Sequence, residues 1–441
     1  MKLTRVWRFV CFYMKNYLGI LLVFFSTFGF AQERCGFSIG NKIKQVNNPN
    51  WIKQQIEFEH QLRALENTNV GQMLRITAKI YKIPVVVHVV HNNASNFIGG
   101  TNNTNISDEQ IKSQIKVLND DYRKKVGTNG FNTNPVGADM EIDFELAQKD
   151  PKGNATTGIT RTYVAQQNFD LQYDHKTLAN IIHWDFEKYL NIWVVKSKNG
   201  TIGYSEFPYD SDLIGLEADA SLIAEQNIFD GVIINYTNFG TCCGNLNSTY
   251  NLGRTVTHEV GHWLGLLHPN GDSNCGDDFC NDTPQIEKLN DGTTCNKLTS
   301  NCGGVIRTNM IENYMDYSPD RCMNTFTNDQ KSRTRLALAL SLKRKKLLLS
   351  LEALAETEKL TISVEPNPAK SIANLRVLFK GEKSVNISVF DLRGIPVYED
   401  VYDAQKSSLY SIKTENLRTG IYIIRVVAGS ETSSQKMVID K

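Results

Sequence analysis

Apolar and polar residues in the middle of the chain form two kinds of segment. Residues 83–90 are almost uninterruptedly apolar, which predicts a strand buried on both faces. Ser107 with Gln110 three positions later predicts a capped helix start, and apolar residues recur at helical spacing from Ile111 to Tyr122. Further strand-like runs lie at residues 142–146, 190–195 and 231–236. Strands that alternate with helices predict an α/β domain.

The C-terminal part of the chain has a different pattern. Short β-branched and aromatic runs at residues 374–379, 385–390, 420–427 and 436–439 are separated by turn sequences. Several short strands between turn signals predict a small β-sandwich over residues 360–441. This part contains no His and no Cys, so we expect no catalysis there. A binding module and a sorting module both fit the pattern.

The N-terminus has a third pattern. Basic residues precede an apolar run over residues 18–30, which ends in the small residues Gly29 and Ala31. This order is typical of a secretory signal peptide, expected over residues 1–31. The run is shorter than the roughly 20 residues of a spanning helix, so we expect no stable transmembrane segment, although an uncleaved anchor is the alternative. A polar stretch follows, with a helix predicted over residues 51–65.

Composition narrows the class of protein. The 441 residues are 41% hydrophobic and 22% charged, which indicates a globular protein with more than one domain. A formal net charge of +1 removes the bulk electrostatic argument for a nucleic-acid partner. Of the nine cysteines, Cys11 leaves with the signal peptide, and most others lie between Cys242 and Cys322. In an exported protein, such a cluster indicates disulfides or a metal site.

The strongest chemical signal is a set of three histidines, His258, His262 and His268, with Glu259 after the first and Gly265 between the last two. On a helix, His258 and His262 lie one turn apart on the same face and can bind one ion. Gly265 can adopt a positive φ and end the helix, which lets His268 supply a third nitrogen. Three protein ligands with a fourth position left to water form a catalytic zinc site. Ordinary core histidines, the alternative, would not explain Glu259 and Gly265 together.

Glu259 lies beside the expected metal rather than on it. Zinc lowers the pKa of a bound water to roughly 7, so hydroxide is available near neutral pH. We expect Glu259 to act as general base towards that water during attack on the scissile carbonyl. The same carboxyl then protonates the leaving amine.

This stretch resembles the extended zinc motif of the metzincin metallopeptidases at every defining position. A downstream methionine turn, residues 313–318, fits the same group, and flanking sequences at residues 253–255 and 282–284 are similar to the pappalysin family and its ulilysin-like branch. The resemblance implies a metzincin-type protease domain over residues 83–340, with a mixed sheet and an active-site helix. It places Met315 beneath the zinc and gives Tyr317 a role in stabilising the tetrahedral intermediate; core packing is the alternative for Tyr317.

The same resemblance implies a latency switch and a specificity residue. Cys35 resembles the zinc-blocking cysteine of ulilysin-like pro-segments, so residues 32–82 would keep the enzyme latent; a structural half-cystine is the alternative. Asp320 matches an acidic position that selects Arg or Lys after the scissile bond, and a solvated loop carboxylate is the alternative.

Calcium and disulfide positions follow from the resemblance as well. Asp278 and Thr283 match residues that bind calcium in the family, in a stretch that is otherwise an acidic loop. The family pattern suggests the disulfides Cys275–Cys302 and Cys295–Cys322. Cys280 could pair with Cys242 or Cys243, and the sequence leaves this connectivity open.

Sequence details at the C-terminus resemble the sorting domain of type-nine secretion cargo. They include Glu365-Pro366-Asn367-Pro368, Gly420-Ile421-Tyr422 and the final strand at residues 436–439. The resemblance implies export through the periplasm and outer membrane of a gram-negative bacterium, with the outer-membrane secretion machinery as partner. Residues 341–359 are then a linker.

Together these patterns predict a secreted zinc endopeptidase that acts on proteins or peptides and is made as a latent zymogen. A metzincin-fold protein with another substrate preference, or a non-catalytic surface adhesin, is the alternative.

Overall fold

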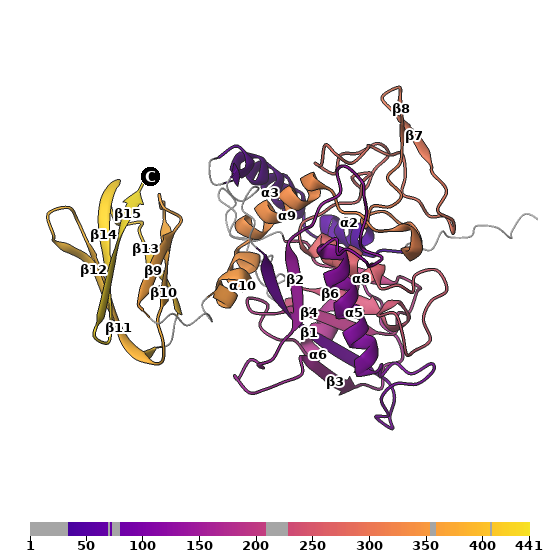
Figure 1. Ribbon diagram of the computed structural model, residues 1–441, viewed down its shortest axis with the longest axis horizontal. Coiled ribbons are helices and arrows are strands. Elements are labelled where there is room, and N and C mark those ends of the chain that lie inside the picture. The colour runs from indigo at the N-terminus through magenta and orange to yellow at the C-terminus, as the bar shows by residue number, and fades with distance from the viewer. Residues whose placement is uncertain (1–33, 69–70, 73–79, 209–227, 353–358, 406–407) are drawn as a thin grey trace, which may run out of the picture.

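The computed structural model describes residues 34–68, 71–72, 80–208, 228–352, 359–405 and 408–441. The expected signal peptide lies outside these residues. Two folded parts are visible in Figure 1, a mixed helix-and-sheet domain and a C-terminal domain of strands. None of the described helices is both long and apolar enough to cross a bilayer.

A six-stranded sheet forms the centre of the larger domain. Its strands are β1 (Tyr81–His91), β2 (Ile142–Leu146), β3 (Ile159–Tyr163), β4 (Leu190–Val195), β5 (Gly203–Ser205) and β6 (Val232–Asn235). The order is β2-β1-β4-β6-β5, and β3 pairs with the second half of β1. All pairs are parallel except β5, which runs antiparallel to β6 at the edge. The expected mixed sheet is therefore confirmed.

Both faces of this sheet are covered, as the apolar character of β1 predicts. Val85, Val87 and Val89 pack into the core that contains the apolar faces of α5 (Asp108–Tyr122) and α8 (Arg254–Trp263). Val90 points into the opposite core, which α6 (His175–Ile181) covers. Alternate residues of one strand thus face two different cores.

The start of α5 differs in one respect from its sequence signal. The Ser107 hydroxyl accepts a bond from the Gln110 amide N at 3.2 Å, as a helix cap does. The Gln110 side chain does not return the bond, because it donates to the carbonyls of Tyr236 and Phe239 at 3.2 and 2.7 Å. These carbonyls belong to the turn η1 (Tyr236–Asn238) and its end, where they lack helical partners.

Four further helices surround the end of α8. They are α2 (Phe37–Asn47), α3 (Asn50–Glu66), α9 (Asn328–Leu340) and α10 (Leu342–Glu352), and α3 confirms the helix predicted over residues 51–65. Figure 1 shows α3 beside α9. A hairpin of β7 (Thr299–Cys302) and β8 (Val305–Thr308) and the short turn η2 (Asp320–Cys322) complete the domain.

Helix α10 extends the folded domain beyond the boundary expected at residue 340. Its Leu347 is fully buried in the main core. Arg344 pairs with both carboxylate oxygens of Asp230, and its Nε donates to the Trp263 carbonyl of α8 at 3.1 Å. Residues 342–352 of the expected linker are thus helical and pack against the larger domain.

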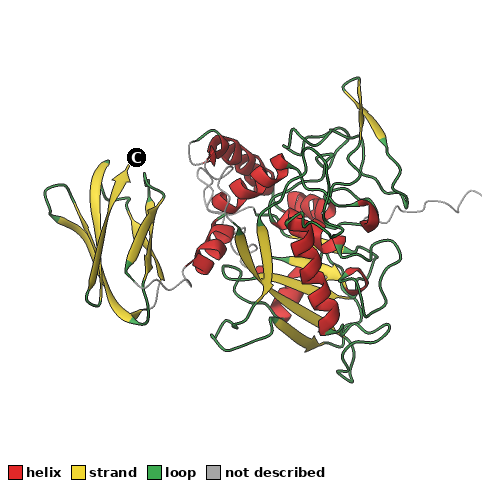
Figure 2. Ribbon diagram, in the orientation of Figure 1, coloured by secondary structure: helices red, strands yellow, loops and turns green. Residues whose placement is uncertain are grey.

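The C-terminal domain consists of two antiparallel sheets, shown in Figure 2. One has the order β13-β10-β9 and the other β12-β11-β14-β15. The strands are β9 (Thr361–Glu365), β10 (Ile372–Leu378), β11 (Lys383–Phe390), β12 (Pro396–Gln405), β13 (Ser408–Lys413), β14 (Gly420–Ala428) and β15 (Glu431–Ile439). Their inward-facing residues form a core of their own, so the expected β-sandwich is confirmed.

Candidate metal centre and active site

Three buried histidines converge on one point. His258 and His262 project from the same face of α8, and Gly265, with φ +95°, ends the helix so that His268 returns to them. The three Nε2 atoms lie 3.1–3.2 Å from one another. Two nitrogens bound tetrahedrally at the zinc distance lie roughly 3.3 Å apart, so the spacing fits a zinc ion.

Each imidazole is oriented by a bond at its other nitrogen. The Nδ1 atoms of His258 and His262 lie 2.7 and 2.8 Å from the carbonyls of Tyr314 and Leu266. The Nδ1 of His268 lies 2.6 Å from Asp272 Oδ1. Such partners hold the Nδ1–H tautomer, which leaves every Nε2 lone pair available to a metal. Burial and the neighbouring rings lower the pKa of His258 and His262 well below the ordinary value, which favours the neutral ligand form.

Glu259 lies next to this cluster and against the edge strand β5. A side chain at Gly203 would overlap the Glu259 carboxyl, so this close approach needs glycine. Oε2 of Glu259 makes no hydrogen bond, and burial raises the pKa of the carboxyl to about 8. A carboxyl with a spare oxygen beside a metal cluster is placed to exchange protons.

The methionine turn lies beneath the helix. Met315 is fully buried, and its sulfur occupies the space that a side chain at Gly261 would need. Tyr317 packs edge-on against His268, with ring centroids 5.0 Å apart, and lies 5.8 Å from His258. The structure thus brings Met315 and Tyr317 to the histidines.

Cys35 completes the cluster from the N-terminal segment. Its sulfur and the three histidine nitrogens all lie within 4.8 Å of one another, and the residue is completely buried. Gly36 N donates to Gly203 O at 2.8 Å and Ile202 N to Arg34 O at 2.9 Å. Cys35 therefore forms an isolated parallel β-bridge with Gly203 of β5.

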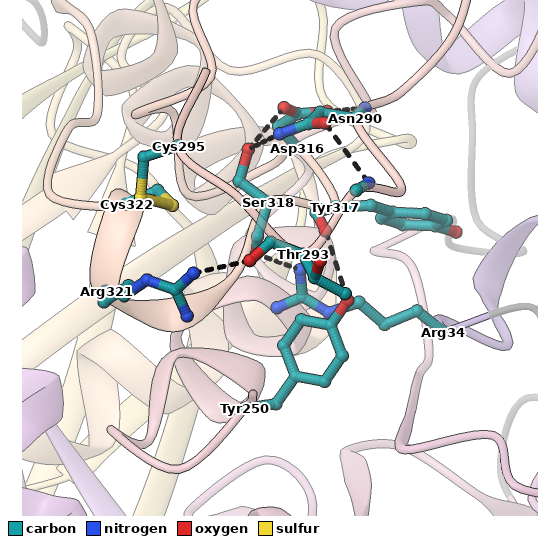
Figure 3. Close-up of a disulfide and its surroundings, with 11 residues drawn as sticks. Arg34, Tyr250, Asn290, Thr293, Cys295, Asp316, Tyr317, Ser318, Arg321 and Cys322 are labelled. Carbon is teal, nitrogen blue, oxygen red and sulfur yellow. Dashed lines mark hydrogen bonds between the residues drawn. A yellow bond between two sulfur atoms is a disulfide. The ribbon is translucent and has the colours of Figure 1, made fainter. Parts of the chain in front are cut away.

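Arg34 is buried beside Tyr250, Ser318 and Asp320, which together form the Asp320 pocket; Figure 3 shows Arg34 next to Tyr250, Tyr317 and Ser318. Its Nη1 donates to the Ser318 carbonyl at 2.7 Å, and its guanidinium lies 4.2 Å above the centre of the Tyr250 ring. Nη2 lies 3.6 Å from Oδ1 of Asp320. A cation thus meets a carbonyl, an aromatic face and a carboxylate.

Asp320 is buried rather than solvated. Its Oδ2 accepts bonds from Leu252 N at 2.8 Å and Arg254 N at 3.2 Å, at the beginning of α8. Burial raises the pKa of the Asp320 carboxyl, and Arg34 opposes this. One oxygen therefore caps the metal-bearing helix while the other faces the pocket.

Asp278 and Thr283 come together at a separate place. The Thr283 hydroxyl lies 2.8 and 2.7 Å from the two Asp278 oxygens, and burial raises the Asp278 pKa to about 7. They line a cavity of about 480 Å³ together with Asp277 and Asp282. A group of carboxylate and hydroxyl oxygens around one cavity fits a cation site of oxygen ligands.

The structure contains the disulfides Cys275–Cys302 and Cys295–Cys322. It corrects the expected pairing of Cys280 with Cys242 or Cys243. Cys242 and Cys243 are bonded to each other, and Cys280 remains a buried thiol among the described residues. The reason is that Cys280 turns into the Asp278 loop, where its backbone bonds Asp278 and Thr283.

Sequence reasoning missed several contributors to this site. Strand β5 is only three residues long, Gly203–Ser205, and carries no alternating pattern. Arg34 lies far from the histidine motif in sequence, and Tyr250 precedes it in a stretch without a regular apolar pattern. Arg34 directly precedes Cys35, and that basic–cysteine pair was the available signal.

Comparisons with known proteins agree with this geometry. Residues 172–339 match the family described as pregnancy-associated plasma protein-A, and residues 363–440 match the secretion system C-terminal sorting domain. An extracellular metalloprotease of Verticillium alfalfae is 34% identical over 254 residues, which are 57% of this chain and 75% of that protein. Another, from Podospora anserina, is 29% identical and covers 64% of this chain and 82% of its own length.

Two solved structures from Tannerella forsythia resemble the fold. A promirolysin mutant is 33% identical, with a TM-score of 0.60, and the match covers 74% of this chain and all of that one. Mature mirolysin in complex with a cleaved peptide is 36% identical, with a TM-score of 0.53, and covers 63% of this chain and 99% of its own.

Proposed function

The chain belongs to the pappalysin-type family of metallopeptidases, and we propose that this secreted metalloendopeptidase uses zinc held by His258, His262 and His268. The observation that carries this proposal is the convergence of three Nε2 atoms at 3.1–3.2 Å. When bound, zinc would polarise water and the scissile carbonyl and would favour the thiolate of Cys35. The intact Glu259 beside the cluster favours an active enzyme over an adhesin.

Glu259 is the general base and acid of this proposal. Its carboxyl takes a proton from the attacking water and delivers it to the leaving amine as the peptide bond breaks. Tyr317, against His268 and His258, donates from its hydroxyl to the developing oxyanion. Met315 supports the histidines from below through packing.

The N-terminal segment keeps the enzyme latent. Cys35 occupies the position where a fourth ligand would lie, and its β-bridge to Gly203 covers the edge strand. Support also comes from the pro-form of mirolysin, which matches a larger share of this chain than the mature form does. Activity then requires that the segment be cut off. The cut would lie within or directly after residues 32–82, the expected pro-segment.

Asp320 selects a substrate with a basic residue after the scissile bond. In the latent form, Arg34 occupies the pocket beside Asp320 where that basic residue would bind. Arg34 precedes Cys35 in a segment parallel to β5. A substrate whose Arg or Lys follows the scissile bond must enter the same pocket with the opposite chain direction. The latent segment therefore offers the right side chain in a direction that does not align its own peptide bond for cleavage.

The expected calcium site is proposed at Asp278 and Thr283. Support comes from the carboxylate itself: burial raises the pKa of Asp278 to about 7 although Arg333 acts against this, and the Thr283 oxygen lies beside both carboxylate oxygens. The C-terminal sorting domain marks the chain for type-nine export to the outer membrane or the extracellular space.

The substitution Glu259→Gln tests the catalytic proposal. The variant is expected to keep its zinc and its unfolding temperature but to lose at least roughly 1,000-fold in casein hydrolysis, because the proton acceptor is gone. Zinc content by elemental analysis accompanies the assay. Full activity of a zinc-loaded Glu259→Gln protein would remove Glu259 from the mechanism.

A further inference from the structure

We propose an apolar substrate subsite on the opposite side of the metal cluster from the Asp320 pocket, built on Phe207 and suited to a large aromatic or aliphatic side chain. It rests on the proposed latency and chain direction. The subsite takes one of the residues that precede the scissile bond. Phe37 of the N-terminal segment occupies it in the latent form.

Phe37 contacts the active site with its ring, as a bound apolar side chain of a substrate would. Its ring stacks on His262 with centroids 4.0 Å apart and planes 12° apart. It also lies 5.5 Å from the ring of Phe207, and only 1% of Phe37 is exposed. An aromatic ring of the segment therefore lies directly over one metal ligand.

The catalytic domain supplies a continuous apolar lining here. Phe207, Leu336 and Ala337 are buried in one cluster with Cys35 and Phe37, and Leu267 packs against it. Part of the cover comes from α3, whose Phe58 meets Phe207 edge-on at 5.8 Å. Among the described residues, the buried members of this cluster that lie outside the catalytic domain all belong to residues 34–66 of the N-terminal segment: Cys35, Phe37, Trp51, Phe58 and Leu62.

Removal of the segment exposes this lining in the mature enzyme. Soluble proteins rarely expose a contiguous apolar patch beside an active site unless it binds something. The patch continues from the metal ligand His262, so a substrate aligned on the metal must pass over it. The occupant with the matching chemistry is an apolar side chain of the substrate.

The order of contacts along the segment fixes which side of the scissile bond is involved. Arg34 lies in the Asp320 pocket, Cys35 at the metal, and Phe37 beyond it. If a basic residue after the scissile bond occupies the Asp320 pocket, residues before that bond lie towards Phe207. Cleavage sites should therefore combine an apolar residue before the bond with a basic residue after it.

Fluorogenic peptides test the subsite on the secreted, processed, zinc-loaded enzyme. Each carries Arg after the scissile bond, and Phe, Leu, Ala or Glu is placed in turn at each of the three preceding positions. At one of these positions kcat/KM for Phe or Leu is expected to exceed that for Ala by on the order of 10-fold. Glu there should be cleaved least, because its charge would enter an apolar lining.

In the variant Phe207→Ala, kcat/KM for the Phe peptide divided by kcat/KM for the Ala peptide should fall close to 1. The variant Phe207→Leu should keep most of the preference for the Phe peptide. This ratio does not depend on how much of a preparation is folded, since both peptides meet the same enzyme. Phe97→Ala is the matched control, because Phe97 is 66% exposed on the loop between β1 and α5 and does not belong to the cluster around Phe207. Its ratio should equal that of the unaltered enzyme.

The outcomes separate the subsite from the protease function. Cleavage of the Arg peptides with equal rates for all preceding residues overturns the subsite and leaves the protease intact. A preserved ratio in Phe207→Ala also overturns it. No cleavage of any peptide by the zinc-loaded, processed enzyme overturns the proposed function and the subsite together.

Discussion

The two ends of the chain relate to the catalytic domain in opposite ways. The N-terminal segment shares one apolar cluster with the catalytic domain and places Arg34, Cys35 and Phe37 inside the active site. The C-terminal sandwich buries its apolar residues in a separate core. A segment that shares a core with the active site can control activity, whereas a domain with its own core can be added or removed without touching the chemistry.

Truncation of the chain between the catalytic domain and α10 should cause the largest loss of stability. A chain that ends at residue 340 lacks Arg344 and leaves the Asp230 carboxylate buried without its cation. Loss of one partner from a buried pair costs about 3–5 kcal/mol. The free energy of unfolding should fall by at least that amount in denaturant titrations, because the buried Leu347 is lost as well. Arg344 and Asp230 form such a buried ion pair, because their side chains are only 2% and 3% exposed.

A chain that ends at residue 352 is the matched control. It keeps α10 and loses only the sandwich, so its unfolding midpoint and its casein hydrolysis after processing should equal those of the full chain. If this shorter chain also loses stability or activity, the sandwich supports the catalytic domain and the contrast between the two ends fails.

Cys35→Ala should break the latency that the N-terminal segment imposes. Loss of the thiol removes the fourth candidate ligand of the histidine cluster. The early activity of the unprocessed chain should rise roughly 10–100-fold, which corresponds to about 1.4–2.8 kcal/mol of lost stability of the closed state. The rate is measured with an Arg peptide before any cut appears on a gel.

Cys280→Ala is the control for that change, because Cys280 is the other buried thiol among the described residues. It lies in the Asp278 loop and should leave early activity unchanged. Equal behaviour of the two variants would mean that Cys35 only fills space.

Sequence and structure agree where local chemistry decides the conformation. The helix that carries His258 and His262, the turn at Gly265 and the strand β1 all follow from spacing and apolar pattern. The short edge strand β5 and the pocket around Tyr250 are set by tertiary contacts, which leave no periodic trace. The packing of α10 after residue 340 leaves no periodic trace for the same reason, since burial of Arg344 depends on Asp230, more than 100 positions away.

Asp320→Asn should have a smaller effect on activity than the loss of Cys35. The amide keeps an oxygen that can accept from Leu252 N and Arg254 N, so the cap of α8 survives and the unfolding midpoint should change little. The charge that faces Arg34 is lost, and charge-assisted contacts of this kind contribute about 1.5–3 kcal/mol.

Two activities of the Asp320→Asn enzyme should therefore change together. Cleavage of Arg peptides by the processed form should fall on the order of 10-fold relative to peptides with Leu after the scissile bond. Early activity of the unprocessed chain towards the Leu peptides should rise, since Arg34 holds the N-terminal segment less firmly. Asp403→Asn in the sandwich should change neither rate. A loss of Arg cleavage without weaker latency would show that substrate and N-terminal segment use different pockets, because a shared carboxylate must affect both.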